Sequence, residues 1–519
     1  MSSSSAVTTA PVLEVPSAGG GGAAGNGAAP PLWRWWVWAL VGLAVIGGAV
    51  AVVLASGMTP SFDAYGWLVW GHQILYGNLN LNAAPSWKPL MIIFTLPMAL
   101  FGTGDVPPRL LAIVTTAGTL ATAPFAARIA YRLLVGDRGP TLTRRVRIAA
   151  WIGGLFALVG VLGLQGYPIP AGGPPQSLWR LTFIADSDPL CAAIVLAAFD
   201  AHLARRPKLA YILLFFAGLN RPEAWAILGL YGLYLMWKVP GTRALVLGSW
   251  VLTAVAWYLP TALAAKSIFQ ASKLDQGKAS TITGEPVWPV LQRWATFYEW
   301  PMQVAALLGV VFGLLRRERA VLLITAACAV WLAVEMLFAL HGFSAVARYM
   351  IEPADLMIAV AGYGIAQALA GPWEGLRRRC ERWTLAVAAP LVAVGLMAGL
   401  GYFLHIRQSR VRALVPAVRN YGKVKSHLTE VVARAGGPAA VLACGPPAAK
   451  NQFQTQMAWT LGLNGNQVLF NPSWLIRHHT RMVLFTQTPA NGWVVRAYNM
   501  PASIAARCDR EMAVTVPSS

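Results

Sequence analysis

Residues 34–56 read RWWVWALVGLAVIGGAVAVVLAS, and no charged residue follows Arg34 in this run. An α-helix rises about 1.5 Å per residue, so the run is long enough to cross the roughly 30 Å hydrocarbon core of a membrane. It is too long for the apolar core of a signal peptide, and no convincing small-residue cleavage site follows it. We therefore predict a membrane-spanning helix that the protein retains.

Similar apolar runs recur along the chain, and we predict about eleven transmembrane helices in all. The composition agrees, since 56% of the 519 residues are apolar and only 12% are charged. A soluble domain interrupts its apolar runs with charge every few residues. The sequence therefore predicts an α-helical polytopic membrane protein. Further spans are predicted near 108–135, 148–164, 187–204, 208–220, 223–238, 244–265, 301–315, 320–340, 350–370 and 384–404.

The net charge of +21 comes from short Arg and Lys clusters between the predicted spans. It is therefore a topology signal and no sign of nucleic-acid binding. If the N-terminus is cytoplasmic, all of these clusters fall on the cytoplasmic side, provided that 208–238 forms two short spans around Asn220-Arg221-Pro222-Glu223. The proline and the two charges favour that split. The clusters are Arg144–Arg147, Arg205-Arg206, Lys238 with Arg243, Arg316–Arg319 and Arg377–Arg379.

Three regions differ in composition. Residues 1–32 are Ser, Ala, Gly and Pro with almost no charge, which predicts a disordered cytoplasmic tail. Residues 33–405 form the predicted transmembrane domain, with interfacial helices within 57–107. Residues 406–519 are soluble-like, and they predict a small extracytoplasmic α/β domain. Its strand-like runs are 440–443, 482–485, 492–495 and 512–515.

Two of the five cysteines, Cys444 and Cys508, lie in this C-terminal region. An extracytoplasmic compartment is oxidising, so these two side chains can close a disulfide. Two isolated thiols are the alternative, and their spacing alone does not decide between them.

Asp63 follows the first span and lies just beyond the predicted membrane surface. Trp67, Trp70, Ile74 and Leu75 can share one face of an amphipathic helix that begins near it. At the N-terminal end of such a helix the local dipoles favour an ionised carboxylate, which would be available as a base. The alternative is that Asp63 only caps the helix.

Asp186 and Asp188 stand one residue apart at the outer end of the predicted span 187–204. Such a pair can share a hard divalent cation, Mg or Mn, or one carboxylate can orient an acceptor. The alternative is helix capping by either residue. The sequence requires no other cofactor, and no histidine has companions at a zinc-like spacing.

The order of these features resembles the GT-C superfamily of membrane glycosyltransferases. The resemblance rests on the first span, Asp63 in the first outside loop, the interfacial helix, the stretch Trp87-Lys88-Pro89-Leu90 and a second half-buried apolar helix. It covers roughly 34–405 and leaves the C-terminal region unmatched. It implies that the sugar arrives on a polyprenyl phosphate and that Asp63 acts on the acceptor hydroxyl. Asp186 and Asp188 resemble an acidic pair of the second outside loop.

Two arginines carry further parts of the resemblance. Arg221, with Glu223, lies at membrane depth in an Arg-Pro-Glu turn. Arg221 can engage the donor phosphate while Glu223 contacts the sugar, or the two form an internal ion pair. Arg348-Tyr349 resembles an Arg-Tyr pair that faces the donor phosphate in relatives, and interfacial anchoring is its alternative. Lys88 can add positive potential or merely snorkel, and His341 is a candidate substrate contact.

These observations predict a glycosyltransferase, hexosyl or pentosyl, of the plasma (inner) membrane. High Ala, Gly, Arg and Trp usage suggests an actinobacterium, where relatives transfer mannose or arabinofuranose from a polyprenyl phosphate. The expected acceptor is an envelope glycan, glycolipid or protein. Asp63 would be the general base, and Arg348 with Arg221 would stabilise the departing phosphate. The alternative is a secondary transporter or lipid-linked sugar flippase, which predicts charges along a transmembrane path.

Overall fold

A computed structural model describes residues 35–83, 86–136, 142–163, 177–276, 282, 284–370, 382–489 and 491–516. The predicted tail at 1–32 and the basic cluster Arg377–Arg379 lie outside these residues. Contacts divide the chain into two compact units, Met1–Ala44 and Val45–Ser519. The first contains the start of helix α1, and the contacts discussed below belong to the second.

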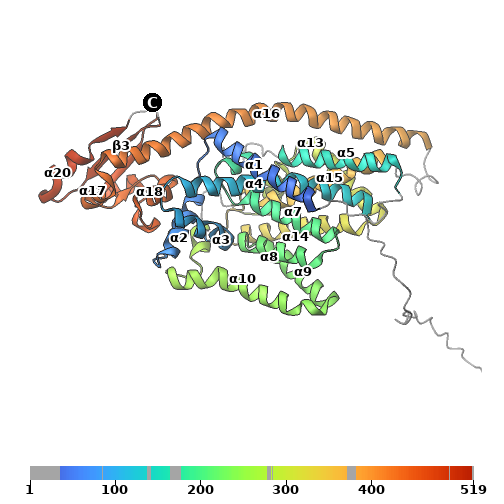
Figure 1. The fold of residues 1–519 in the computed structure, drawn as a ribbon, viewed down its shortest axis with the longest axis horizontal. Coiled ribbons are helices and arrows are strands. Elements are labelled where there is room, and N and C mark those ends of the chain that lie inside the picture. The colour runs from blue at the N-terminus through green and yellow to red at the C-terminus, as the bar shows by residue number, and fades with distance from the viewer. Residues whose placement is uncertain are drawn as a thin grey trace, which may run out of the picture. The chain divides into compact units, whose positions relative to one another are not determined.

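Every predicted span forms an α-helix (Figure 1). The reason is local, since long apolar runs satisfy all their backbone hydrogen bonds only as helices when they lie in lipid. The helices are α1 (Trp35–Ser56), α4 (Val106–Val135), α5 (Arg144–Leu162), α7 (Asp188–Leu203), α8 (Pro207–Asn220), α9 (Ala224–Lys238), α10 (Arg243–Ala264), α13 (Trp300–Arg316), α14 (Arg319–Leu340), α15 (Ile351–Ala370) and α16 (Arg382–Arg434).

The number of helices that can cross a membrane is smaller than predicted. In the described part of the chain seven helices are long and apolar enough, or eight if the bent pair α12 and α13 is one span. The difference from about eleven arises because α7, α8 and α9 have only 16, 14 and 15 residues, and α13, with 17, counts only as part of the bent pair. The protein is an α-helical polytopic membrane protein with helices of unequal length. Shorter elements are α2 (Phe62–Leu75), α3 (Pro89–Met98), η1 (Ala99–Phe101), α6 (Leu178–Phe183), η3 (Pro240–Thr242), α11 (Gln270–Asp275), α12 (Val287–Ala295) and η4 (Ala347–Met350).

Helix α15 is the buried centre of the helical part, because 89% of the residues in its most apolar stretch are buried. It packs against α4, α5, α7, α13 and α14. Glycines allow the closest of these contacts, because a Cβ atom on Gly362 would lie 2.4 Å from the Gly153 carbonyl oxygen of α5. Small residues let helix backbones approach in this way within membranes. The packing fixes the N-terminal end of α15, where Arg348 and Glu352 lie.

The short helices α2 and α3 pack directly on each other. A Cβ atom on Gly71 of α2 would lie 2.7 Å from the backbone carbonyl of Thr95 in α3, so the two backbones touch at this glycine. Asp63 lies in the first turn of α2, and Lys88 is the N-cap residue of α3. The α2–α3 pair therefore carries two of the predicted functional residues at its helix starts.

Helix α16 runs without a break from Arg382 to Arg434, from the helical part of the protein to the β-strands (Figure 1). The domain boundary predicted at residue 406 therefore falls inside a helix. The helix stops before Gly436 and Gly437, both at φ +85°, a conformation that favours glycine.

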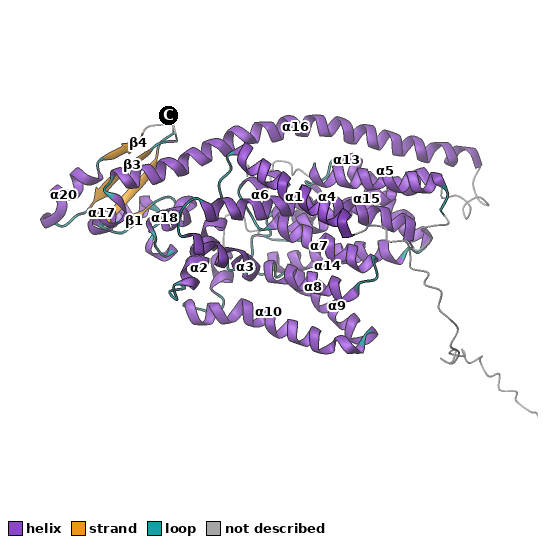
Figure 2. Ribbon diagram, in the orientation of Figure 1, coloured by secondary structure: helices purple, strands orange, loops and turns teal. Residues whose placement is uncertain are grey.

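Beyond α16 lies a four-stranded sheet in the order β1-β2-β3-β4, with β1 and β2 parallel and the other pairs antiparallel (Figure 2). The strands predicted at 482–485 and 492–495 are confirmed within β2 and β3. The strand predicted at 440–443 is wrong, because this alanine-rich run follows Pro438 and forms helix α17. The run 512–515 is partly helical, since α20 ends at Met512. The elements are α17 (Gly437–Cys444), β1 (Pro447–Ala448), η5 (Asn451–Phe453), α18 (Gln454–Leu461), η6 (Gly465–Gln467), α19 (Pro472–Arg477), β2 (Met482–Gln487), β3 (Trp493–Tyr498), α20 (Ala502–Met512) and β4 (Val514–Val516).

The main hydrophobic core of the C-terminal region is shared with α2 and α3, and a small cluster of Ala448, Leu475, Met482 and Leu484 is its own. Trp67 of α2 and Met91 of α3 belong to the same buried cluster as Phe453, Met457 and Trp493.

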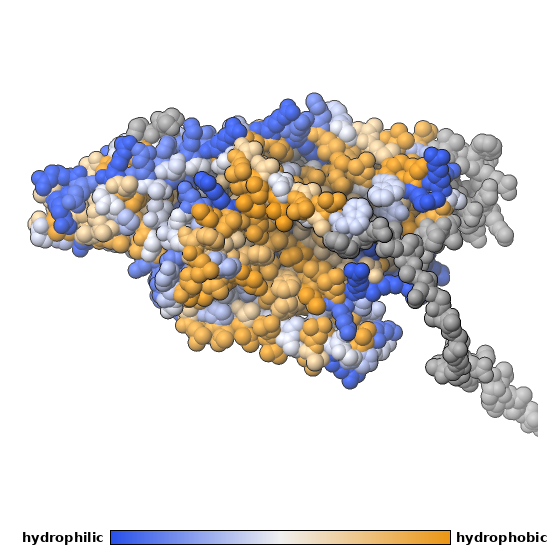
Figure 3. All heavy atoms as spheres, viewed as in Figure 1, coloured by the Kyte–Doolittle hydropathy of each residue, from blue (hydrophilic) through white to orange (hydrophobic). Residues whose placement is uncertain are grey.

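A disulfide joins Cys444 of α17 to Cys508 of α20, with Cα atoms 5.7 Å apart. On the face shown in Figure 3, apolar side chains cover much of the helical part, and hydrophilic ones gather over the sheet and its helices.

Candidate active site

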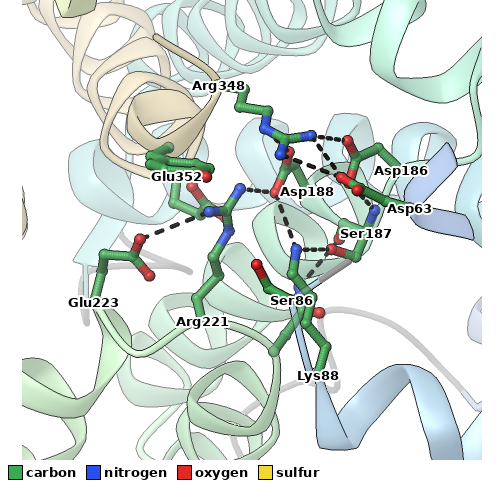
Figure 4. Close-up of polar contacts among 12 residues, drawn as sticks. Asp63, Ser86, Lys88, Asp186, Ser187, Asp188, Arg221, Glu223, Arg348 and Glu352 are labelled. Atoms are coloured by element: carbon green, nitrogen blue, oxygen red, sulfur yellow. Dashed lines mark hydrogen bonds and ion pairs between the residues drawn. The ribbon is translucent and has the colours of Figure 1, made fainter. Parts of the chain in front are cut away.

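Charged side chains from five separate segments meet where helices begin or end (Figure 4). These segments are the first turn of α2, the N-cap of α3, the turn before α7, the break between α8 and α9, and η4 with the start of α15. Most residues singled out from the sequence lie in this cluster. Its members are Asp63, Lys88, Asp186, Ser187, Asp188, Arg221, Glu223, Arg348, Tyr349 and Glu352.

Arg348 of η4 bridges two carboxylates. Its Nη1 and Nη2 atoms both donate to Asp63 Oδ2 at 3.2 Å, and Nη1 also donates to Asp186 Oδ2. Its Nε atom lies 4.0 Å from Asp188 Oδ2. The side chains of Arg348 and Asp63 are each 23% exposed, whereas Asp186 is 1% exposed. The Arg348–Asp63 pair is therefore the accessible end of the cluster.

Arg221 is the centre of a deeper group. Its guanidinium contacts Asp188 and lies 3.6 Å from Glu223 Oε1 and 3.9 Å from Glu352 Oε1. The Arg221 side chain is 3% exposed. A guanidinium at this depth is stable only with such partners. The internal ion pair considered for Arg221 and Glu223 therefore exists, as part of a larger network.

The ring of Tyr349 lies close to both arginines. The Cζ atom of Arg221 is 4.3 Å from the ring centroid, and that of Arg348 is 5.4 Å away. Trp331 of α14 donates its indole N–H to the Tyr349 carbonyl oxygen at 2.9 Å. Tyr349 thus couples the deep and accessible halves of the cluster through cation–π contacts.

Lys88 reaches the cluster from α3. Its Nζ donates to Ser187 Oγ at 2.5 Å and lies 4.0 Å from Asp188 Oδ1. Burial lowers the pKa of Lys88 to about 8, the charges of Arg221 and Arg348 act in the same direction, and Asp186 opposes them. Lys88 therefore loses its charge at a lower pH than an exposed lysine does.

The turn before α7 presents Asp186 and Asp188 to the cluster. Ala185 adopts φ +54°, a left-handed conformation that is unusual for a residue with a Cβ and is often found at functional sites. Asp186 accepts the backbone N–H of Ser187 at 2.7 Å, and Ser187 is the N-cap residue of α7, so this bond fixes the turn before the helix and does not cap the helix itself. Burial opposes ionisation of Asp186, but the charges of Arg348, Lys88 and Arg221 outweigh this and hold its pKa below the usual range.

The geometry at Asp186 and Asp188 does not fit the Mg or Mn ion considered from the sequence. Each carboxylate faces an arginine, and a divalent cation would have to displace that guanidinium. Among the described residues, no group of three or more His, Cys, Asp or Glu side chains lies together as a metal site requires.

His341 is not drawn into the cluster. It is the C-cap of α14, its side chain is exposed, and its Nδ1 lies 2.7 Å from the Leu337 carbonyl oxygen of its own helix. Closeness to Arg348 in sequence did not bring the two side chains together, because the intervening segment turns before η4.

Three buried acids near the cluster were missed by the sequence interpretation. Glu352, Glu335 and Asp355 are each 0% exposed, and Glu352 reaches Arg221. The sequence did contain a signal for Glu352, because it follows Arg348 by four residues, and residues at that spacing lie on the same face of a helix. Glu335 and Asp355 are acids within apolar runs, which is itself a sign of function or pairing in a membrane.

Together the fold and the cluster define an α-helical membrane protein with a charged site at helix ends. No family model and no curated protein matches the sequence. Among solved structures the chain resembles "ArnT from Cupriavidus metallidurans bound to Undecaprenyl phosphate", at 13% identity and a TM-score of 0.49, over 91% of this chain and 99% of that one. The apo state of the same ArnT gives 13% identity and a TM-score of 0.49, over 86% and 92%. Similarity at this level assigns no function to this chain.

Proposed function

We propose that this protein is a membrane glycosyltransferase of the GT-C type that uses a polyprenyl-phosphate sugar as its donor. The carrying observation is the contact between Asp63 and Arg348, a carboxylate and a guanidinium at the accessible end of the cluster. The two groups match the two needs of the reaction. A base accepts the proton of the acceptor hydroxyl, and a cation stabilises the departing phosphate.

Arg348 must exchange one partner for the donor phosphate. Asp63 is the partner to leave, because it shares the exposed end of the pair, whereas Asp186 is buried. The exchange keeps Arg348 anchored on Asp186 and releases the Asp63 carboxylate toward the acceptor. Lys88 and Arg221 add positive potential from the buried side of the cluster. The planar guanidinium of Arg348 is suited to bidentate binding of a phosphate.

In the transfer step, the proton of the acceptor hydroxyl moves to a carboxylate oxygen of Asp63. The acceptor oxygen bonds to the anomeric carbon from the side opposite the phosphate. The bond between that carbon and the phosphate oxygen breaks, and its electron pair stays on the polyprenyl phosphate. The transfer inverts the anomeric configuration, and Arg348 with Arg221 stabilises the charge on the phosphate. Glu223 is buried, at 3% exposed, and one of its carboxylate oxygens lies 3.6 Å from Arg221, so its role in this proposal is to orient Arg221.

The site faces the extracytoplasmic side in this proposal, with the N-terminus in the cytoplasm. Arg145, in a basic cluster, donates its Nε–H to the Leu369 carbonyl oxygen near the C-terminal end of α15. Arg348 lies at the opposite end of the same helix. Basic clusters favour the cytoplasmic side, which leaves the charged site and the disulfide-bonded C-terminal region outside.

The sugar is mannose or arabinofuranose, and the acceptor is an envelope glycan, glycolipid or protein. The test uses the purified, lipid-reconstituted protein with radiolabelled polyprenyl-phosphate mannose or arabinose and envelope extracts. We expect transfer with one donor, and a fall of about 10²- to 10⁴-fold in Asp63→Asn. Asp509→Asn, an exposed carboxylate of α20, is the matched control and keeps wild-type activity. Equal activity in Asp63→Asn would remove the base from the proposal.

The rival function is a secondary transporter or lipid-linked sugar flippase, and one observation favours it. Glu335 and Asp355 lie fully buried within α14 and α15, next to Glu223 and Glu352 of the cluster. Buried acids deep in a membrane protein often mark a path for ions or protons. In the same vesicles, movement of the labelled donor to the opposite leaflet without a new glycosidic bond would establish this rival.

A further inference from the structure

The helix that carries Asp63 is not capped by its own side chains. Ser61 is the N-cap residue of α2, and its hydroxyl makes no capping hydrogen bond. An Asp in the first turn needs a fixed backbone if its carboxylate is to meet Arg348 at a defined angle. The partners that fix this backbone come from distant parts of the sequence.

Two tethers hold the turn before Asp63. Thr455 Oγ1 of α18 donates to the Phe62 carbonyl oxygen at 2.6 Å, across 393 residues of sequence. The Ser61 N–H donates to the Ile184 carbonyl oxygen at 2.9 Å, just before the Asp186 turn. The turn is thus held between the C-terminal region and the segment that bears Asp186.

The residues next to Thr455 are also polar and buried, as expected if its contact with α2 is part of the fold. Gln454, Thr455 and Gln456 are polar, yet they are 3%, 1% and 1% exposed. Gln456 Nε2 points at the Pro60 carbonyl oxygen at a longer 3.5 Å. A buried run of three polar residues is costly unless each finds partners, and two of these three find theirs on the segment before Asp63.

The far end of α2 is held by the same region. Gln73 Nε2 donates to Asn464 Oδ1 at 2.6 Å, and Trp459 of α18 packs near the rings of Tyr65 and His72, with centroids 6.4 and 6.3 Å away. Helix α18 and the loop after it therefore follow α2 along its length.

We propose that Thr455 is a positioning residue for Asp63, so that the C-terminal region completes the active site. This rests on the proposed glycosyl transfer. The Thr455 hydroxyl is bonded to the backbone one residue before Asp63 and does not reach the reacting atoms itself. Its loss lets the first turn of α2 shift, and a shift of about 1 Å in a reacting group can reduce a rate by up to 10²-fold.

The test compares Thr455→Val, which removes the hydroxyl at nearly constant volume, with Thr455→Ser, which keeps it. In Thr455→Val we expect kcat to fall by about 10- to 100-fold while the donor KM stays within about 2-fold, since the base is not needed to bind the donor. Thr455→Ser restores kcat. Thr429→Val, at an exposed threonine of α16 whose hydroxyl bonds within its own helix, is the control and leaves kcat unchanged.

A second measurement does not depend on sugar transfer. Hydrogen exchange of the full-length protein in lipid discs follows the amides of residues 61–66. We expect faster exchange in Thr455→Val and wild-type exchange in Thr455→Ser and Thr429→Val. Unchanged exchange in Thr455→Val, or equal loss of kcat in Val and Ser variants, overturns the positioning role. If the wild type transfers no sugar, the proposed function fails, while the exchange data still decide whether the tether exists.

Discussion

Arg348 contacts two carboxylates, Asp63 and Asp186, through one planar guanidinium. Its guanidinium donates to Asp63 through two nitrogens and to Asp186 through one of them. An ammonium is a point charge on a flexible stem, so it fixes the direction of two carboxylates less well than a planar guanidinium does. In the proposed function the orientation of the Asp63 carboxylate therefore depends on the shape of Arg348 as well as on its charge.

For this reason Arg348→Lys is expected to lower kcat by about 10²- to 10³-fold, the usual range for removing one donor from a charge-stabilising site. The variant retains the positive charge beside Asp63 and Asp186, so the temperature at the midpoint of thermal unfolding should change little. Steady-state kinetics and thermal unfolding in detergent measure the two effects. Full activity in Arg348→Lys would contradict a role for the planar guanidinium.

Lys88 gives the site a predicted pH dependence. Burial lowers its pKa to about 8, so it is charged below this pH and neutral above it. In the proposed function Lys88 adds positive charge beside the donor phosphate, and kcat/KM for the donor should therefore fall as the pH rises through about 8. Because the pKa of Lys88 is lowered from its ordinary 10.5 to about 8 in the folded protein, the folding stability should increase as the pH rises from about 8 to about 10.5.

The control for this titration is Lys88→Arg, since a guanidinium stays charged throughout the accessible pH range. We expect the fall in kcat/KM near pH 8 to disappear in this variant. A fall of the same size at the same pH in Lys88→Arg would assign the titration to another group.

Among the elements, α15 tolerates the least change because its backbone touches its neighbours. Gly362 faces the Gly153 carbonyl of α5, and Gly309 of α13 faces the Val360 carbonyl of α15, where added Cβ atoms would lie 2.4 and 2.3 Å away. Backbone atoms cannot move aside as a flexible side chain can. The position of η4 and its Arg348 depends on this packing.

Gly362→Ala should therefore destabilise the protein by about 1–3 kcal/mol, the usual range for overpacking a core. Thermal unfolding in detergent measures it. Gly395→Ala on α16 is the matched control, because a Cβ there meets nothing within 4 Å. Similar thermal midpoints for the two variants would show that α15 can shift at little cost.

The helices also show which parts of the fold could be predicted from the sequence. The apolar runs became helices because their length and composition are local properties. The helix α16 continues about 30 residues past the predicted span although Pro416 and Gly422 lie within it, and it ends only before Gly436 and Gly437, so local helix-breaking residues did not mark its end. At the site, helix ends marked Asp63 and Arg348 separately, but their pairing joins residues 285 positions apart and no local pattern encodes it.

At the scale of the whole molecule, the proposed orientation places the loop between α9 and α10 inside the cell and α19 outside. Gly241 and Ser473 are exposed residues in these two places. With Cys380 replaced by Ser, an impermeant maleimide should label Ser473→Cys in intact cells and Gly241→Cys only after permeabilisation. The reverse pattern would invert the topology and move the site to the cytoplasmic face.

The shared core of α2, α3 and the C-terminal region also has a consequence in time. A ribosome adds about 5–20 residues per second, so the 393 residues between Phe62 and Thr455 take about 20–80 s to synthesise. During that interval the surface of α2 around Trp67 lacks the C-terminal residues that later cover it, and chaperones and proteases can reach it at the membrane. A nascent or prematurely terminated chain therefore holds the Asp63 helix without its partner, and the proposed active site is complete only when the last region has folded back onto one of the first.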